Sequence, residues 1–186
     1  AFYVLDTTEL AIQNSDFPLG SIPVRLMFGV DDETLYMIST AGIEVLNVST
    51  PNAPVALTAA PFVTPGAASD LVALTFGDDI YLYIADFDAG LSIARSSAAT
   101  PGTIELVSGS YVVSGAPIVR SVGATPGQAF LSGSAPALWT ADTRHPAAMS
   151  LIGSGVPMST TITAMQVQGN WLFGTAGTAG LLRFVI

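Results

Sequence analysis

The chain has 186 residues, of which 50% are hydrophobic and 10% are charged, and its formal net charge at pH 7 is −9. This hydrophobic content excludes a disordered chain, and the 18 Gly and 12 Pro argue against long helices. The negative charge argues against nucleic acid and anionic membranes as partners, and the absence of cysteine excludes disulfides, zinc–thiolate sites and thiol catalysis.

The first 23 residues predict part of a β unit, with short apolar runs at residues 2–6 and 9–12. Neither a starting Met nor a basic leader is visible, so we expect that a leader was removed or that the chain belongs to something longer. No run of 18 or more apolar residues occurs, so no transmembrane helix is expected.

The next segments predict a repeated series of short strands. Residues 24–66 hold an acidic turn at 31–33, strands at 34–38 and 44–48, a Pro-containing loop and a further strand from 55. Residues 67–114 repeat this order, with strands at 80–85, 92–94 and 104–107. Residues 115–158 form a third copy with a less regular pattern, and residues 159–186 form a partial fourth.

The turn glycines show the length of this repeat. Gly42 and Gly90 lie 48 residues apart, and Gly90 and Gly180 lie 90 apart, so one unit takes roughly 45 residues. A unit of this length with about four strands is typical of a β-propeller blade. The sequence therefore predicts an all-β, propeller-like array of three full blades with partial blades at both ends. The array could close on itself, belong to a longer propeller, or pair its edge strands with a neighbouring subunit.

The strand–turn–strand–Pro pattern resembles the LVIVD repeat. It is carried by AGIEVLNVSTPNAPV at 41–55, AGLSIARSSAATPG at 89–102, PALWTADTRHPAAM at 136–149 and AGLLRFVI at 179–186. The second segment has Arg95 or Ser96 where the family favours Asp, and the third lacks the turn Gly. The resemblance implies β-propeller blades of bacterial or archaeal surface or secreted proteins, and it implies no established chemistry.

A candidate metal site is the sequence Asp86-Phe87-Asp88-Ala89-Gly90. Oxygen ligands at alternate positions before a Gly can wrap Ca²⁺, so Asp86 and Asp88 are the candidate ligands. The alternative is that both aspartates are residues of an ordinary polar turn and bind no ion. The same alternatives apply to the acidic residues at 31–33 and 78–79, which either bind cations on one face or form hairpin turns.

Three other features suggest hypotheses about catalysis, glycosylation and sugar binding. His145 is the only histidine and has no nucleophile motif beside it, so no enzyme is predicted. Asn47-Val48-Ser49 is an N-glycosylation sequon. The strand aromatics are expected to form the core between blades, and an exposed row of them could stack on sugars. They are Tyr36, Tyr81, Tyr83, Trp139, Trp171 and Phe173.

These observations predict a non-enzymatic scaffold or protein-interaction module at the cell surface or outside the cell, self-assembling through edge strands. The expected partner is protein, either further copies or a larger assembly, and no cofactor is expected unless Ca²⁺ binds. The alternative is a Ca²⁺-dependent propeller that binds or hydrolyses carbohydrate. The low charge and the Ser/Thr-rich composition favour the extracellular setting.

Overall fold

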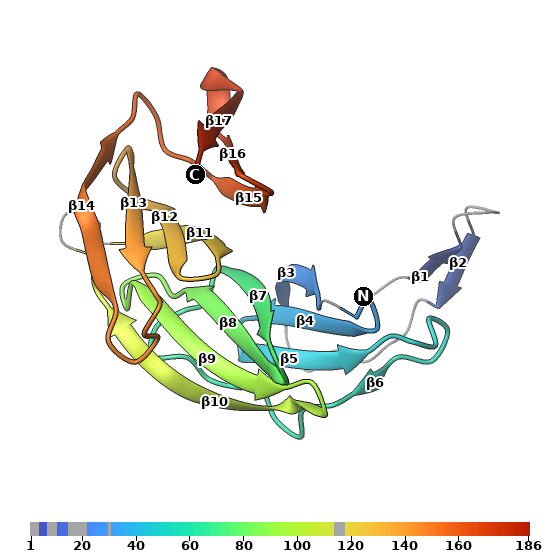
Figure 1. Ribbon diagram of the computed structural model, residues 1–186. Coiled ribbons are helices and arrows are strands. Elements are labelled where there is room, and N and C mark those ends of the chain that lie inside the picture. The colour runs from blue at the N-terminus through green and yellow to red at the C-terminus, as the bar shows by residue number, and fades with distance from the viewer. Residues whose placement is uncertain (1–3, 7–10, 15–21, 30, 114–117) are drawn as a thin grey trace.

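The protein folds as a β-propeller array (Figure 1). The structure is a computed structural model, and it describes residues 4–6, 11–14, 22–29, 31–113 and 118–186. Within these residues the regular structure is strand throughout, apart from the three-residue 3₁₀ helix η1 at Gly177–Ala179. The all-β, propeller-like prediction is therefore confirmed.

Three antiparallel sheets of four strands follow one another along the chain. The first blade has β3 (Pro23–Phe28), β4 (Thr34–Ser39), β5 (Gly42–Asn47) and β6 (Val55–Ala56). The second blade has β7 (Asp70–Phe76), β8 (Asp79–Ala85), β9 (Leu91–Ser97) and β10 (Thr100–Tyr111). The third blade has β11 (Val119–Thr125), β12 (Gln128–Gly133), β13 (Ala137–Asp142) and β14 (Ser150–Pro157).

The two ends of the array hold smaller sheets. The last blade has three strands, β15 (Ala164–Gln168), β16 (Trp171–Thr175) and β17 (Leu181–Val185). At the other end β1 (Val4–Asp6) and β2 (Ala11–Asn14) pair with each other. The rest of the predicted partial blade at 1–23 lies largely outside the described residues.

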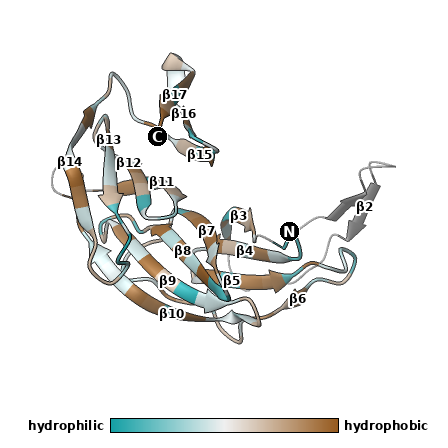
Figure 2. Ribbon diagram, viewed as in Figure 1, coloured by the Kyte–Doolittle hydropathy of each residue, from teal (hydrophilic) through white to brown (hydrophobic). Residues whose placement is uncertain are grey.

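Each blade is a simple meander in which the spatial order of strands follows the chain. The first strand of each blade lies innermost, and residues of β3, β7, β11 and β15 line a common axial cavity of about 620 Å³. Hydrophobic colouring runs along the strands of every blade (Figure 2). Figure 1 shows an arc that is open between the last blade and the first.

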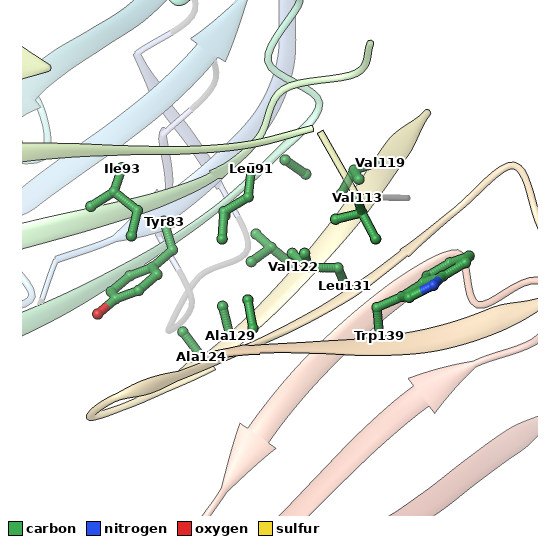
Figure 3. Packing of buried hydrophobic residues seen from close by; sticks show 12 residues of the cluster. Tyr83, Leu91, Ile93, Val113, Val119, Val122, Ala124, Ala129, Leu131 and Trp139 are labelled. Carbon is green, nitrogen blue, oxygen red and sulfur yellow. The ribbon is translucent and has the colours of Figure 1, made fainter. Parts of the chain in front are cut away.

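The core lies between consecutive blades, because a sheet alone cannot cover both of its faces. One hydrophobic cluster joins the first and second blades, another the second and third, and another the third and last. Figure 3 shows the middle cluster, with Tyr83, Leu91 and Ile93 of the second blade facing Val122 and Leu131 of the third. The predicted placement of Tyr36, Tyr83 and Trp139 in this core matches their burial.

One aromatic side chain recurs in the second strand of each blade. Tyr36, Tyr83 and Phe130 each pack into the cluster shared with the following blade, and each is buried. Each stands opposite a central residue of the third strand, as Tyr36 does with Val45. We call these side chains the junction aromatics, because each fills the space between two blades.

A buried carboxylate links three blades near the axis. Asp70 lies at the start of β7, and its Oδ1 is 2.7 Å from Nε of Arg25 on β3. Its Oδ2 accepts hydrogen bonds from the Ser121 hydroxyl at 2.9 Å and the Val122 amide at 3.1 Å, both on β11. Burial raises the pKa of Asp70, while Arg25 and the hydrogen bonds oppose that rise.

Candidate functional site

Asp86, the first candidate calcium ligand, is fully buried, and protein groups engage its carboxylate. Oδ1 accepts a hydrogen bond from the Thr64 hydroxyl at 2.6 Å. Oδ2 accepts from the Ser92 hydroxyl at 2.7 Å and from the Gly66 amide at 3.1 Å. These bonds tie the β8–β9 turn to the segment that precedes β7, which is a structural role for Asp86.

Asp88, the second candidate, lies exposed in the same turn. The turn is closed by backbone bonds from the Asp86 amide to the Gly90 carbonyl and from the Ala89 amide to the Asp86 carbonyl, each 2.9 Å long. In the described part of the chain, no group of three or more His, Cys, Asp or Glu side chains is placed to hold a metal ion. The calcium hypothesis for Asp86 and Asp88 stays a prediction.

The remaining acidic candidates and His145 lie in turns and loops. Asp31 accepts bonds from the Thr34 amide at 2.9 Å and hydroxyl at 2.8 Å, and so closes the β3–β4 hairpin. Burial, the largest single contribution, acts to raise the pKa of Asp31. The hydrogen bonds from Thr34 and Glu33 together outweigh burial, so the pKa lies below its usual value. Asp78 and Asp79 lie at the β7–β8 turn, and the His145 carbonyl accepts a loop hydrogen bond from the Ala148 amide.

Asn47, the sequon residue, belongs to a turn that recurs in three blades. Its Oδ1 accepts from the Ser49 amide at 3.0 Å and the Ser49 hydroxyl at 2.6 Å. Asp142 accepts from the amide two residues on at 3.0 Å, and the Ser97 hydroxyl does the same at 3.2 Å. All three end a third strand. In the second blade the position is therefore filled by Ser97, not by Arg95 or Ser96.

The Asp142 turn leads to a pH prediction. Hydrogen bonds from the Arg144 side chain are the largest cause that lowers the pKa of Asp142 to about 2. Because the folded pKa lies below the ordinary value of 3.8, the stabilisation is present above that pH and is lost as the pH falls toward 2. We expect Arg144→Ala to return the Asp142 pKa most of the way to 3.8 in an NMR titration of the carboxyl carbons. An unchanged pKa in this variant would contradict the assignment to Arg144.

The last blade has a vacant position for a fourth strand. Among the described residues β17 pairs only with β16, whereas the third strand of each other blade pairs on both sides. Backbone bonds from Ala176 to Gly180 and from Ile186 to Asn170 place the even-numbered residues against β16. The amides and carbonyls of Leu181, Arg183 and Val185 therefore face outward.

The space around the turn glycines differs in the same way between the blades. In the first and second blades a Cβ added at Gly42 or Gly90 would lie 2.4 Å from the Phe62 carbonyl oxygen or 2.1 Å from that of Tyr111. Both carbonyls belong to the segment that follows the third strand outward in the same blade. A Cβ at Gly180 would meet nothing within 4 Å.

The outer face of the last blade exposes apolar side chains. Trp171 is 37% exposed, Leu181 67% and Val185 75%. Phe173, which occupies the position of a junction aromatic, is partly exposed. Arg183, paired opposite Phe173, stacks its guanidinium 4.3 Å from the ring centre of Trp171. We call this surface the open face.

The opposite end of the arc exposes a second apolar surface. Val24, Leu26 and Phe28 alternate along β3 and are all exposed, whereas Met27 packs into the cluster with the second blade. Their side of the sheet corresponds to the side of the second blade that packs on the first. We call these three residues the β3 stripe. The sequence placed Trp171 and Phe173 on strands and in the core between blades, whereas the structure leaves Trp171 exposed and Phe173 partly exposed.

The comparisons with known proteins identify a fold and no family. No protein-family model matches the chain, and no curated protein matches it. The computationally designed Ika4 protein is similar in structure, with 12% identity and a TM-score of 0.58 over 92% of this chain and 96% of that one. No helix in the described residues is long and apolar enough to cross a membrane.

Three other propeller structures match along about half of their own length. A chain of the mitotic checkpoint complex shares 14% identity over 88% of this chain and 51% of its own, with a TM-score of 0.63. The Cps50 (Swd1) β-propeller domain of Myceliophteria thermophila shares 12% identity over 89% of this chain and 54% of its own, also at 0.63. The match to the Neurospora crassa Pan2 WD40 domain covers 47% of the length of that chain. This chain thus spans about half of these propellers.

Proposed function

We propose that this chain is a non-enzymatic protein-interaction module that takes up a strand from a protein partner at the outer edge of β17. The observation that carries the proposal is the vacant fourth-strand position, with outward-facing backbone groups from Leu181 to Val185. An edge of this kind is a template for strand addition, in which main-chain hydrogen bonds provide affinity and alternate side chains provide specificity.

The second blade indicates what such a strand needs. There β10 pairs with β9 over Leu91 to Ser97, and β9 begins with Leu directly after Gly90, as β17 does after Gly180. Glu105 of β10 bonds Arg95 of β9 through the guanidinium, with Nε 2.9 Å from the carboxylate. A strand of mixed apolar and acidic residues therefore suits this kind of edge.

The setting of the module is also part of the proposal. We place it outside the cell or at the cell surface, on the basis of its low charge, its Ser/Thr-rich composition and its LVIVD-like repeats. One similar structure is a chain of the mitotic checkpoint complex, an assembly of proteins, which supports a protein as partner. Fractionation of the source cells tests the location, and recovery of the protein only from the cytosol would refute it.

A peptide with the sequence of β10, residues 100–111, provides the test. We expect the fluorescently labelled peptide to bind the diluted protein saturably in anisotropy measurements, while a scrambled peptide does not. Arg183→Pro removes one outward amide without touching the bonds to β16, so it should weaken capture about 10-fold or more.

Arg183→Ala is the matched control, because it removes the same side chain and keeps the backbone amide. It should retain capture within about 3-fold. Equal binding of the native and scrambled peptides, or undiminished binding to Arg183→Pro, would show that the β17 edge does not accept a strand.

A further inference from the structure

We propose that a pocket between the second and third blades binds a proline-rich segment of a protein partner, held in the polyproline II conformation. The pocket has a volume of about 380 Å³, which falls within the usual range of ligand-binding pockets. It is a separate site from the β17 edge, so this proposal does not depend on strand addition.

Aromatic rings of the second blade form one wall of the pocket. Phe76 lies at the end of β7, and Tyr81 and Tyr83 follow on β8. The rings of Phe76 and Tyr81 stand edge to face, with their centroids 5.6 Å apart and their planes at 82°. Phe76 is 38% exposed, so this aromatic surface is accessible to a ligand.

Two turns of the third blade form the other wall. Pro126 and Gly127 belong to the β11–β12 turn, and Thr143, Arg144 and Pro146 lie in the loop after β13. The Thr143 amide donates a hydrogen bond to the Gly127 carbonyl at 2.9 Å. A Cβ added at Gly127 would lie 2.8 Å from Cγ of Arg144, so the stem of Arg144 packs directly on the turn. These contacts hold the two turns together and form the wall without a ligand.

The Thr143 hydroxyl lacks a partner within the protein. Thr143 is 2% exposed, and among the described residues its Oγ1 makes no hydrogen bond. The Tyr83 hydroxyl is close by, since burial raises the pKa of Tyr83 and the Thr143 side chain acts to lower it, yet no hydrogen bond of regular geometry joins the two groups. A buried hydroxyl without a partner is unfavourable, and an acceptor on a ligand in the pocket satisfies it.

The charges around the pocket indicate an uncharged ligand. Arg144 forms an ion pair with Asp142. Arg95, which stands opposite Tyr81, forms one with Glu105. Each guanidinium therefore has its own carboxylate, and the pocket favours neither an anion nor a cation.

A proline-rich segment matches this chemistry. Proline rings are apolar and uncharged, and they dock in aromatic-lined grooves of peptide-binding domains. A polyproline II segment has no internal hydrogen bonds, so its carbonyls are free to accept from the Thr143 hydroxyl. A sugar carries hydroxyls around its ring and needs several polar partners, whereas the described residues that line this pocket include no carboxylate or amide side chain. The lining therefore favours the peptide over a sugar.

Fluorescence anisotropy with a labelled oligoproline of about nine residues, three turns of the polyproline II helix, tests the proposal. We expect saturable binding of this peptide and none of a Gly/Ser peptide of the same length. Phe76→Ala removes one ring of the aromatic wall and should weaken binding about 10-fold or more. Trp171→Ala is the matched control, because Trp171 is an aromatic residue of equal exposure (37%) on another blade, and binding should stay within about 2-fold.

Thr143→Val gives the sharpest result, because it removes the hydroxyl and keeps the branched side chain. The hydroxyl has no partner in the free protein, so thermal unfolding should show no loss of stability. Peptide binding should nevertheless weaken about 5-fold or more, since the ligand carbonyl loses its donor. A hydroxyl with only a structural role would give the reverse pattern.

Three results would overturn the proposal: no saturable binding of the oligoproline, equal binding by wild-type protein and Phe76→Ala, or a Thr143→Val variant that loses stability and keeps its affinity. A glucan oligosaccharide that binds more tightly than the oligoproline would assign the pocket to a sugar and reject the peptide. Circular dichroism should show unchanged folding in all three variants.

Discussion

Replacing Asp70 by Ala is expected to lower the free energy of unfolding by about 2–4 kcal/mol, because the change removes a buried carboxylate and leaves its hydrogen-bond donors unpaired, while the Arg25 side chain, 33% exposed, still reaches solvent. Arg25 would lose its carboxylate at 2.7 Å, and the Ser121 hydroxyl and Val122 amide would lose their acceptor. These groups come from the first and third blades, so the loss loosens two junctions at once.

Urea unfolding followed by circular dichroism measures this effect. Asp78→Ala is the control, since Asp78 is an exposed acid in the turn that follows the same strand, and it should change stability by less than about 0.5 kcal/mol. A loss below about 1 kcal/mol for Asp70→Ala would contradict the network. Asp70→Asn keeps one acceptor and should fall between the two.

Replacing Gly90 by Ala is the second large expected change. A Cβ at this position would lie 2.1 Å from the Tyr111 carbonyl oxygen, and the backbone has φ +81°, which L side chains rarely adopt. Gly180 has a similar φ of +75°, but nothing lies within 4 Å of its added Cβ. Comparing Gly90→Ala with Gly180→Ala therefore separates the cost of backbone strain from the cost of a clash with the outer strand.

We expect Gly180→Ala to cost about 1–3 kcal/mol from backbone strain. Gly90→Ala should cost about 1–3 kcal/mol more, because the backbone of β10 must also move. Thermal and urea unfolding of both variants provide the measurement. Equal losses would mean that the outer strand does not press on Gly90, and the comparison between filled and vacant blades would fail.

The sequence was sufficient to predict the repeated unit, because short strands between turn residues have a local pattern. The aromatic residues of the second strands and the acids of the hairpin turns belong to this pattern, and the structure places Tyr36 and Asp31 accordingly. The blade-to-blade repeat could be predicted in the same way, since Gly42, Gly90 and Gly180 each lie at the start of a third strand.

Two features could not be predicted because they depend on contacts distant in the sequence. Asp70 has no equivalent acid in the other blades, and its partners lie 45 residues before it and 51 after it. Its only local signal is a lone acid at the start of an apolar strand. Ser97 was missed because β9 ends two residues further from its turn glycine, Gly90, than β5 ends from Gly42.

Hydrogen exchange at the outward amides of β17 tests the vacant edge most directly. In the protein at high dilution, the amides of Leu181 and Arg183 should exchange rapidly, because no strand pairs with that edge of β17. The amides of Leu91 and Ile93 in β9 should exchange slowly, because β10 covers that edge. Equal protection of the two strands in the diluted protein would show that β17 is already paired, and it would contradict the vacant edge on which the proposed function depends.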